Sequence, residues 1–282
     1  VFYNQAVDNY LDEKMRADTK PNDKPYKDGA CYTGKEHSWD EAFGYWGAAA
    51  HSLLLSAEQN YNIAKKKDLV SADYNEDGVV DLKSEYVFAH AYYASSFDKG
   101  GKTSYMEDIT RAFLDGRKLI TSANGEKLTD AQRSELMGYV AIISENWQKV
   151  IAESVFKYAG STYKSLVALE DVNNDDLAKE FSKYMKYWGE LKGFSMALQV
   201  GKDNIGESAT KLNRMIGFGP MLMDETQIVG IDSKGNYVMD KIYSMNDAKL
   251  HMLKIQKLMI DEFGVEARSN DMLADMADLA SK

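Results

Sequence analysis

The stretch that decides the fold class is residues 130–158, which read DAQRSELMGYVAIISENWQKVIAESVFKY. Its apolar side chains recur at intervals of three and four residues, which is the period of an amphipathic α-helix. They are Leu136, Tyr139, Val140, Ile143, Trp147, Val150, Ile151 and Val155. Thr129 and Asp130 at the start of this stretch are typical N-cap residues. We therefore expect a long helix from about residue 130 to about residue 158.

The flanking sequence predicts more helices and almost no strand. The chain of 282 residues has only three prolines, so long segments lack the strongest helix breaker. Helical spacing is found at residues 1–15, from Ser38 onward, and at 85–97, 104–121, 177–198, 203–217, 246–263 and 269–280. Residues 224–240 allow one small β-hairpin, because two apolar pairs flank a polar turn. The expected fold class is all-α.

A short frame of residues occurs twice, about half the chain apart. It comprises Trp39, Glu41, Gly44 and Tyr45 in the first copy and Trp188, Glu190, Gly193 and Phe194 in the second. Self-similarity at half-length indicates a duplicated unit. We expect two related bundles of the four-helix type, at residues 1–125 and 126–282, with one continuous domain as the alternative. A loop insertion at residues 73–85 belongs to the first bundle.

The composition of the chain limits the classes of partner and of structure that we expect. The formal net charge is −10, which disfavours nucleic acid because an acidic surface repels phosphate. No apolar run is long enough to span a bilayer. Cys31 is the single cysteine, so an internal disulfide is excluded. The chain begins at Val1 without an initiator methionine, so we expect an upstream segment, such as a signal peptide or a lipid-anchored leader.

The acidic segment at residues 73–81 has the spacing of a calcium loop. Oxygen-bearing side chains fall at loop positions 1, 3, 5 and 9, and Gly78 falls at position 6, where a sharp turn is needed. Position 12 is Ser84 rather than the usual Glu, and Glu85 follows one place later. The predicted calcium ligands are Asp73, Asn75, Asp77, the Val79 carbonyl, Asp81 and Glu85. The alternative is a polar turn that caps the next helix.

A second candidate metal site is the run that begins at His37. His37 and Glu41 are four residues apart and share one face of a helix, with Asp40 beside them. An imidazole with carboxylates suits iron, zinc or manganese. Such a site needs further ligands, and the candidates are His51, His90 and, from the other bundle, Glu190 of the second frame. The alternative is a helix start in which Ser38 is the N-cap and Glu41 completes a capping box.

Catalytic motifs are absent from the sequence. No nucleophile elbow, no zinc-protease His-Glu-x-x-His run and no glycine-rich phosphate loop occurs. Three histidines lie outside the His37 run. They are His51, His90 and His251, and His90 lies among aromatic residues that are typical of a core. We therefore expect a binding protein more than an enzyme.

Three features together resemble the imelysin-like family, in an uncharacterised branch of bacterial envelope proteins. They are the EHSWDEAFGYWG run at residues 36–47, the acidic loop that leads into Ser84, Glu85 and Tyr86, and the half-length repeat. The resemblance is firmest across residues 30–100. It implies a pair of four-helix bundles, export to the periplasm or outer membrane and, often, a lipid anchor as in lipoproteins. The hallmark of the family is a His-x-x-Glu motif, and His37 with Asp40 is the nearest equivalent.

The resemblance and the acidic residues lead to three functional hypotheses. The first is a bacterial cell-envelope metal-binding protein that holds a divalent cation or helps to acquire iron, with calcium as a structural ion. The second is a surface structural or assembly protein whose helices are stabilised by calcium and which contacts an envelope partner. The third is a metallopeptidase, which would need a further ligand, a general base and an open position for water.

Overall fold

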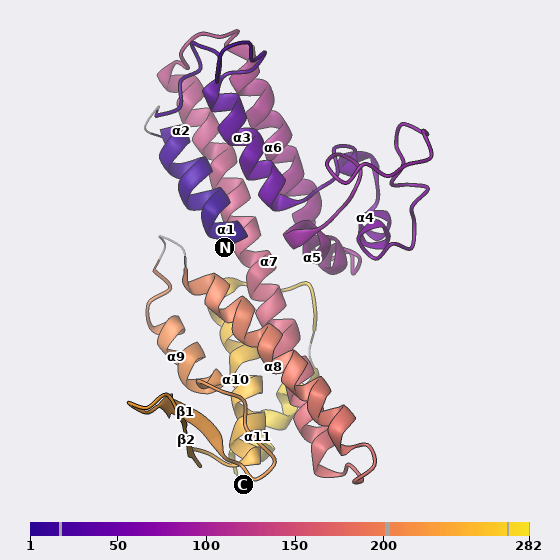
Figure 1. Cartoon of the computed structure of the whole chain (residues 1–282), viewed down its shortest axis with the longest axis vertical. Coiled ribbons are helices and arrows are strands. Elements are labelled where there is room, and N and C mark those ends of the chain that lie inside the picture. Colours follow the sequence, from indigo (N-terminus) through magenta and orange to yellow (C-terminus); the bar gives the residue numbers. More distant parts are fainter. Residues whose placement is uncertain (17–18, 201–203, 270, 282) are drawn as a thin grey trace. The chain divides into compact units, whose positions relative to one another are not determined.

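The structure is a computed structural model that describes residues 1–16, 19–200, 204–269 and 271–281. These residues form two compact units (Figure 1). The first contains residues 1–150 and 200, and the second contains residues 151–199 and 204–281. The division falls inside one helix, α7 (Asp130–Glu170), whereas the sequence-based boundary lies at residues 125 and 126. Both units are helical, which confirms the all-α prediction.

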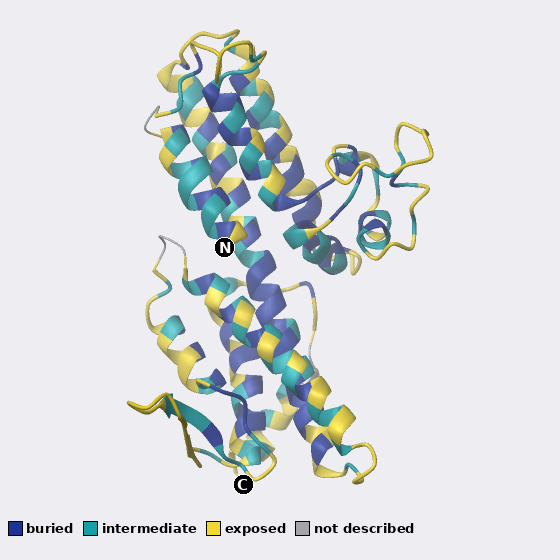
Figure 2. Ribbon diagram, viewed as in Figure 1, coloured by how far each residue is buried: buried dark blue, intermediate teal, exposed yellow. Residues whose placement is uncertain are grey.

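The first unit is a helical bundle with a loop-rich segment attached to it. Its bundle is built from the first part of α7, the N-terminal helical segment and two further helices. Their bounds are α1 (Phe2–Asn4), η1 (Gln5–Glu13), α2 (Lys14–Arg16), α3 (Gly34–Trp46) and α6 (Tyr105–Ser122). The helix α3 contacts η1 on one side and α6 on the other. The buried residues line the faces that these helices turn toward one another (Figure 2).

Three tryptophans form the centre of this core, and each donates a hydrogen bond from its indole nitrogen. Trp39 donates to the Phe113 carbonyl at 2.8 Å, and Trp46 donates to the Thr110 hydroxyl at 3.1 Å. Trp147 donates to Nδ1 of His90 at 2.8 Å. Because a buried N–H without a partner costs about 1–3 kcal/mol, these bonds let large apolar rings be buried without that penalty.

The attached segment runs from the end of α3 to the start of α6. It contains η2 (Ser52–Leu54), α4 (Ala57–Ala64) and α5 (Ala89–Asp98), with a long loop between α4 and α5. Gly47 ends α3 with a φ of +86°, and a Cβ at this position would lie 2.6 Å from the Phe88 carbonyl oxygen. This close approach joins the start of the segment to its end, and only glycine permits it.

The second unit surrounds the remainder of α7 with helices and one hairpin. Its elements are α8 (Leu177–Gln199), α9 (Glu207–Ile216), β1 (Gln227–Ile231), β2 (Tyr237–Asp240), α10 (Met245–Phe263), η3 (Asp271–Asp275) and α11 (Met276–Ala280). The antiparallel strands β1 and β2 pair Gln227 with Asp240, and a bulge lies between Ile228 and Gly230. This hairpin is the one that the sequence allows at residues 224–240.

Polar contacts to α7 hold the second unit together. The buried Glu153 carboxylate accepts hydrogen bonds from the backbone nitrogens of Glu266 and Ala267, at 2.9 and 2.7 Å. The Gln256 side chain donates to the Phe156 carbonyl at 3.0 Å. These bonds fix α10 and the segment after it onto α7.

Several predicted helix starts are wrong by a few residues. The N-cap of α3 is Thr33, which forms a capping box with Glu36, so Ser38 lies inside the helix. The N-cap of α10 is Ser244, with Asp247 as its capping-box partner. In both cases a hydroxyl residue that lies further upstream accepts the hydrogen bond from the backbone nitrogen three residues later.

No helix in the described part of the chain is both long and apolar enough to cross a membrane.

Candidate functional site

The candidate site lies in the loop between α4 and α5 of the first unit. His51 holds the start of this loop, because its Nε2 is 2.9 Å from the Ser71 carbonyl and its ring stacks on Tyr74 at 4.8 Å between centroids. A carbonyl only accepts, so Nε2 carries the proton. Tyr86 holds the end of the loop by donating its hydroxyl to the Ala64 carbonyl at 3.2 Å. The acidic loop, residues 73–85, is thus positioned at both ends.

The first half of the acidic loop is organised by Asp73. Its carboxylate accepts hydrogen bonds from the backbone nitrogens of Asp77 at 3.1 Å and Gly78 at 2.8 Å. Gly78 has a φ of +84°, in the left-handed region where side chains are disfavoured. The sharp turn expected at loop position 6 is therefore present.

Asn75 and Asp77 lie against each other inside this turn. The Asn75 amide donates to Oδ2 of Asp77 at 3.1 Å, and its oxygen accepts from the Asp77 backbone nitrogen at 3.0 Å. The other Asp77 oxygen accepts from the Val79 backbone nitrogen at 2.8 Å. The predicted ligands at positions 1, 3 and 5 are thus neighbours around one turn of chain.

Glu85 closes the loop from its far end. It is 5% exposed, and Oε1 accepts from the backbone nitrogens of Tyr74 and Asn75 at 3.1 and 3.2 Å. Its other oxygen accepts from the Asp81 backbone nitrogen at 2.8 Å. One buried carboxylate therefore joins both limbs of the loop through backbone hydrogen bonds.

Asp81 faces the last turn of the loop. Its carboxylate accepts from the Lys83 backbone nitrogen at 2.9 Å and from the Ser84 hydroxyl at 3.1 Å. These hydrogen bonds, with the Lys83 backbone bond as the largest cause, lower the pKa of Asp81 below its usual value. The carboxylate is therefore charged at neutral pH, as a ligand of a hard cation must be.

The acidic loop offers oxygen atoms, but it does not form a tight cage of carboxylates. Among the described residues, no group of three or more His, Cys, Asp or Glu side chains gathers closely enough to hold a metal ion. A calcium loop also draws on amide and backbone carbonyl oxygens, here Asn75 and Val79. Binding would therefore require Asp73, Asp77 and Asp81 to turn from backbone nitrogens toward an ion.

The His37 run is held by packing and ion pairs. The His37 ring lies 3.8 Å from the Tyr26 ring and 5.7 Å from the Tyr32 ring, between centroids. Its Nε2 is 3.7 Å from a Glu41 oxygen, so the predicted pairing across one helical turn is present. Asp40 instead pairs with Arg117 of α6 at 2.8 Å.

The fourth predicted ligand of this site, Glu190, belongs to α8 of the second unit. In the first unit, Arg117 forms an ion pair with Glu36 at 2.6 Å as well as with Asp40, so its side chain joins two carboxylates of α3 to α6. The structure therefore brings together His37 and Glu41, and it engages Asp40 in a contact between helices.

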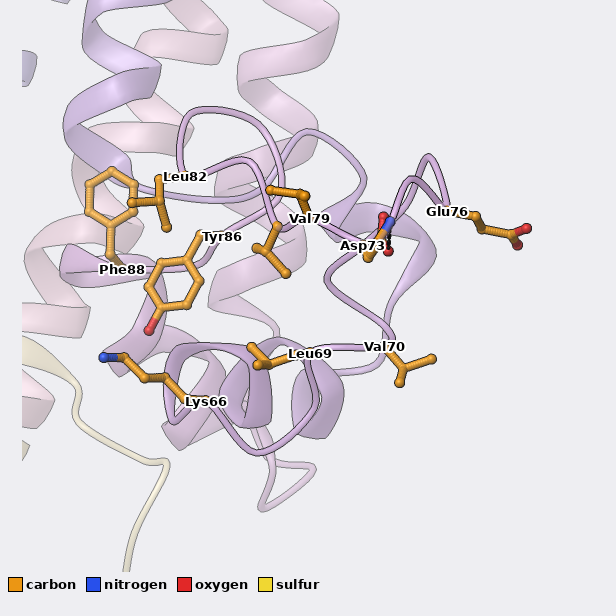
Figure 3. Close-up of a pocket in the computed structure, with 11 residues that line it drawn as sticks. Lys66, Leu69, Val70, Asp73, Glu76, Val79, Leu82, Tyr86 and Phe88 are labelled. Atoms are coloured by element: carbon orange, nitrogen blue, oxygen red, sulfur yellow. Dashed lines mark hydrogen bonds between the residues drawn. The ribbon is translucent and has the colours of Figure 1, made fainter.

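An open groove lies beside the acidic loop and was missed by the sequence analysis. It has a volume of about 1220 Å³, and its walls come from the segment after α4, the acidic loop and the segment before α5 (Figure 3). Its apolar lining consists of Leu69, Val70, Val79, Val80, Leu82, Tyr86 and Phe88. These residues follow neither a helical nor a strand period, so the sequence carries no periodic signal for the groove.

The chain matches no family model, no curated protein and no solved structure in the comparisons made with it. The resemblance to imelysin-like proteins therefore stays a prediction.

Proposed function

We propose that the chain is a calcium-binding helical protein in which the acidic loop takes up one ion. The observation that carries this proposal is the position of Glu85, whose buried carboxylate lies between the two limbs of the loop. The ion would have oxygen ligands from Asp73, Asn75, Asp77, Asp81 and Glu85 and from the Val79 carbonyl. This number of oxygen donors suits calcium, which takes six to eight.

Calcium in this loop would act on the structure of the first unit. The loop connects α4 to α5, and its ends are held by His51 and Tyr86. An ion that draws the carboxylates inward would stabilise this connection and oppose its local unfolding. The location in a bacterial envelope rests on the imelysin resemblance alone, and a second ion of iron or zinc at the His37 run rests on that resemblance and on the residue types of the run. They stay predictions.

Terbium luminescence tests the proposal directly. Tb³⁺ is a hard cation that occupies calcium sites, and Tyr74 lies within the loop, where it can sensitise the emission. We expect sensitised emission that added calcium abolishes and magnesium leaves largely unchanged, because Mg²⁺ requires a smaller, near-octahedral shell. A fully bound ion should also raise the melting temperature of the first unit by roughly 5 °C.

Two variants separate ligands from nearby charges. Asp73→Asn keeps one acceptor oxygen but removes the charge at position 1, and it should abolish most of the emission. Glu76→Gln removes a loop charge at position 4, which is not a ligand position, and it should leave the emission unchanged. Equal loss in both variants, or no emission from the unmodified chain, would refute the proposal.

A further inference from the structure

We propose that a small basic hollow in the second unit binds a phosphate group, either as inorganic phosphate or as the end of a phosphate monoester. The hollow lies between α7, α10 and the segment that follows α10, and it has a volume of about 150 Å³. This inference goes beyond calcium binding and is independent of it, because the acidic loop belongs to the first unit.

The lining of the hollow is rich in cations and contains no carboxylate. It consists of Phe156, Lys157, Gly160, Ser161, Lys164, Gln256, Arg268 and Ser269. Three of these residues are cationic and two carry hydroxyls, whereas the chain as a whole has a net charge of −10. Positive charge that is gathered around one hollow of an acidic chain creates a local potential that attracts a small anion.

The period of α7 places its polar contributors on one face of the helix. Lys157, Ser161 and Lys164 are separated by four and three residues, so they follow one another along that face. The Lys157 ammonium lies 4.7 Å from the centroid of the Tyr158 ring, so it leans toward one edge of the face. Lys164 is exposed, and no carboxylate of the described residues lies within ion-pair distance of it. An anion beside Ser161 would relieve the repulsion between the two ammonium groups.

Two buried hydrogen-bonded contacts hold the opposite wall in place. The Glu153 carboxylate accepts from the backbone nitrogens of the two residues that precede Arg268, at 2.9 and 2.7 Å. Glu153 itself is fully buried and lies outside the lining. Gln256, which is 2% exposed, donates to the Phe156 carbonyl at 3.0 Å. The wall that carries Arg268 is therefore fixed to the wall that carries Lys164.

The donors of the hollow suit a phosphate group better than a carboxylate. The planar guanidinium of Arg268 offers paired N–H groups that match two oxygens of a phosphate. Lys164 adds a point charge with three donors, and the hydroxyls of Ser161 and Ser269 can donate to further oxygens. A carboxylate has only two oxygens and a single charge, so it would leave several of these donors unused.

The size of the hollow limits the ligand to one such group. Its volume of about 150 Å³ is roughly five times the share of about 30 Å³ that a water molecule takes in the liquid. A single tetrahedral anion fits this space, and the rest of an ester would extend through the open side. A long polyanion is disfavoured, because the acidic remainder of the surface would repel its further phosphates.

Isothermal titration calorimetry on the full chain tests the inference, in calcium-free buffer at constant ionic strength. Inorganic phosphate and glycerol 3-phosphate are separate titrants, and we expect at least one of them to bind at one site per chain. Tighter binding of inorganic phosphate would assign the site to the free ion, and tighter binding of glycerol 3-phosphate would assign it to an ester. Acetate should bind at least tenfold more weakly. Absence of binding by both phosphates at millimolar concentration, or equal binding of acetate, would overturn the inference.

Three variants locate the binding site. Lys164→Gln and Arg268→Gln should each weaken phosphate binding about tenfold or more, because each removes a charge-assisted hydrogen bond. Lys179→Gln is the matched control, since Lys179 is an exposed lysine of α8 outside the lining, and it should leave binding unchanged.

Circular dichroism checks that these variants keep their helices, and both lining positions that are changed are exposed. Terbium emission from the acidic loop should be the same in all three variants, so a failure here is distinguishable from a failure of calcium binding. Equal weakening in Lys179→Gln, or full affinity in both lining variants, would show that phosphate does not bind in this hollow.

Discussion

The two units use the same short sequence frame in different ways. In the first unit, Trp39 is 1% exposed and donates to the Phe113 carbonyl at 2.8 Å. In the second, Trp188 is only half-buried and donates to the Ile216 carbonyl at 3.1 Å. Both tryptophans thus join their helix to a neighbouring one through an indole hydrogen bond, but only one of them lies in a sealed core.

The remaining positions of the frame differ in whether they make packing contacts. The aromatic position packs on a ring in both units, Tyr45 on Tyr10 at 5.9 Å and Phe194 on Tyr158 at 5.6 Å, between centroids. The frame glycines Gly44 and Gly193, however, have no atom within 4 Å of where a Cβ would lie. Neither glycine therefore serves the close approach of a neighbouring helix. The repeated sequence frame therefore indicates similar packing of the aromatic side chains in the two units, but no close packing at the two glycines.

The glycine that Trp39 does need lies outside the frame. A Cβ on Gly116 of α6 would lie 2.2 Å from Cζ2 of Trp39. Gly116→Ala should therefore have the largest effect, about 3 kcal/mol or more of lost stability, because neither a helix backbone nor a rigid indole can give way. Urea unfolding followed by tryptophan fluorescence would measure it. Full stability in this variant would show that the core of the first unit is looser than described.

Replacing the frame tryptophans themselves sharpens the comparison. Trp39→Phe should cost about 3 kcal/mol, because it leaves a cavity in a sealed core and removes the indole hydrogen bond to the Phe113 carbonyl. Trp188→Phe should cost about 1 kcal/mol, since the half-buried Trp188 ring leaves less of a sealed cavity when it is shortened. Urea midpoints from circular dichroism would compare the two. Equal costs would mean that the two frames play the same structural role.

Acid should affect the first unit more than the second. Burial lowers the pKa of His90 to about 4, and its Nδ1 accepts the Trp147 hydrogen bond only while neutral. As pH falls from about 6.5 to about 4, the unfolded chain gains a proton that the folded chain resists, so stability is lost through this window. We expect a loss of about 2 kcal/mol, less than the full shift implies because His90 keeps some contact with water.

Unfolding free energies measured at several pH values would test this loss. His90→Gln is the control, because its amide oxygen can still accept from Trp147 but does not titrate in this range. His251 in the second unit also has its pKa lowered by burial, so the second unit should show a weaker trend in the same direction. An unchanged pH dependence in His90→Gln would assign the effect to other groups.

The smallest expected effect concerns the frame glycines. Gly44→Ala and Gly193→Ala should each raise stability by about 0.5–1 kcal/mol, because both positions are helical and open, and alanine favours helix. Differential scanning calorimetry would resolve such shifts. A loss of stability in either variant would show that the glycine does serve close packing, and it would strengthen the case for duplication.

The helices could be predicted from the sequence where the spacing of the apolar residues and the position of an N-cap residue indicate the same start. The helix predicted from residue 130 begins there, and the Thr129 hydroxyl accepts from the Gln132 backbone nitrogen. It continues to Glu170 rather than ending near Tyr158, because the side chains of Tyr163, Leu166 and Leu169 in the following turns are also buried in the core. The helix predicted at residues 85–97 begins at Ala89, since Glu85 is used to close the acidic loop.

The candidate site was predictable only in part. Ligand spacing identified the acidic loop, because calcium loops bind through residues close in sequence. The pairing of Asp40 with Arg117 could not be anticipated, since it joins residues from two helices far apart in the chain. The groove is also a product of tertiary structure, because its walls meet only after His51 and Tyr86 have fixed the ends of the loop.

The exposed thiol of Cys31 has a practical consequence. Because it is the single cysteine, one maleimide reagent would attach one spectroscopic probe per chain at a known position in the first unit. A fluorescent probe there would lie next in sequence to Tyr32, which packs with Tyr26 and His37 in one cluster of rings. The single thiol thus offers a reporter of changes around the His37 run, such as those that added metal would cause.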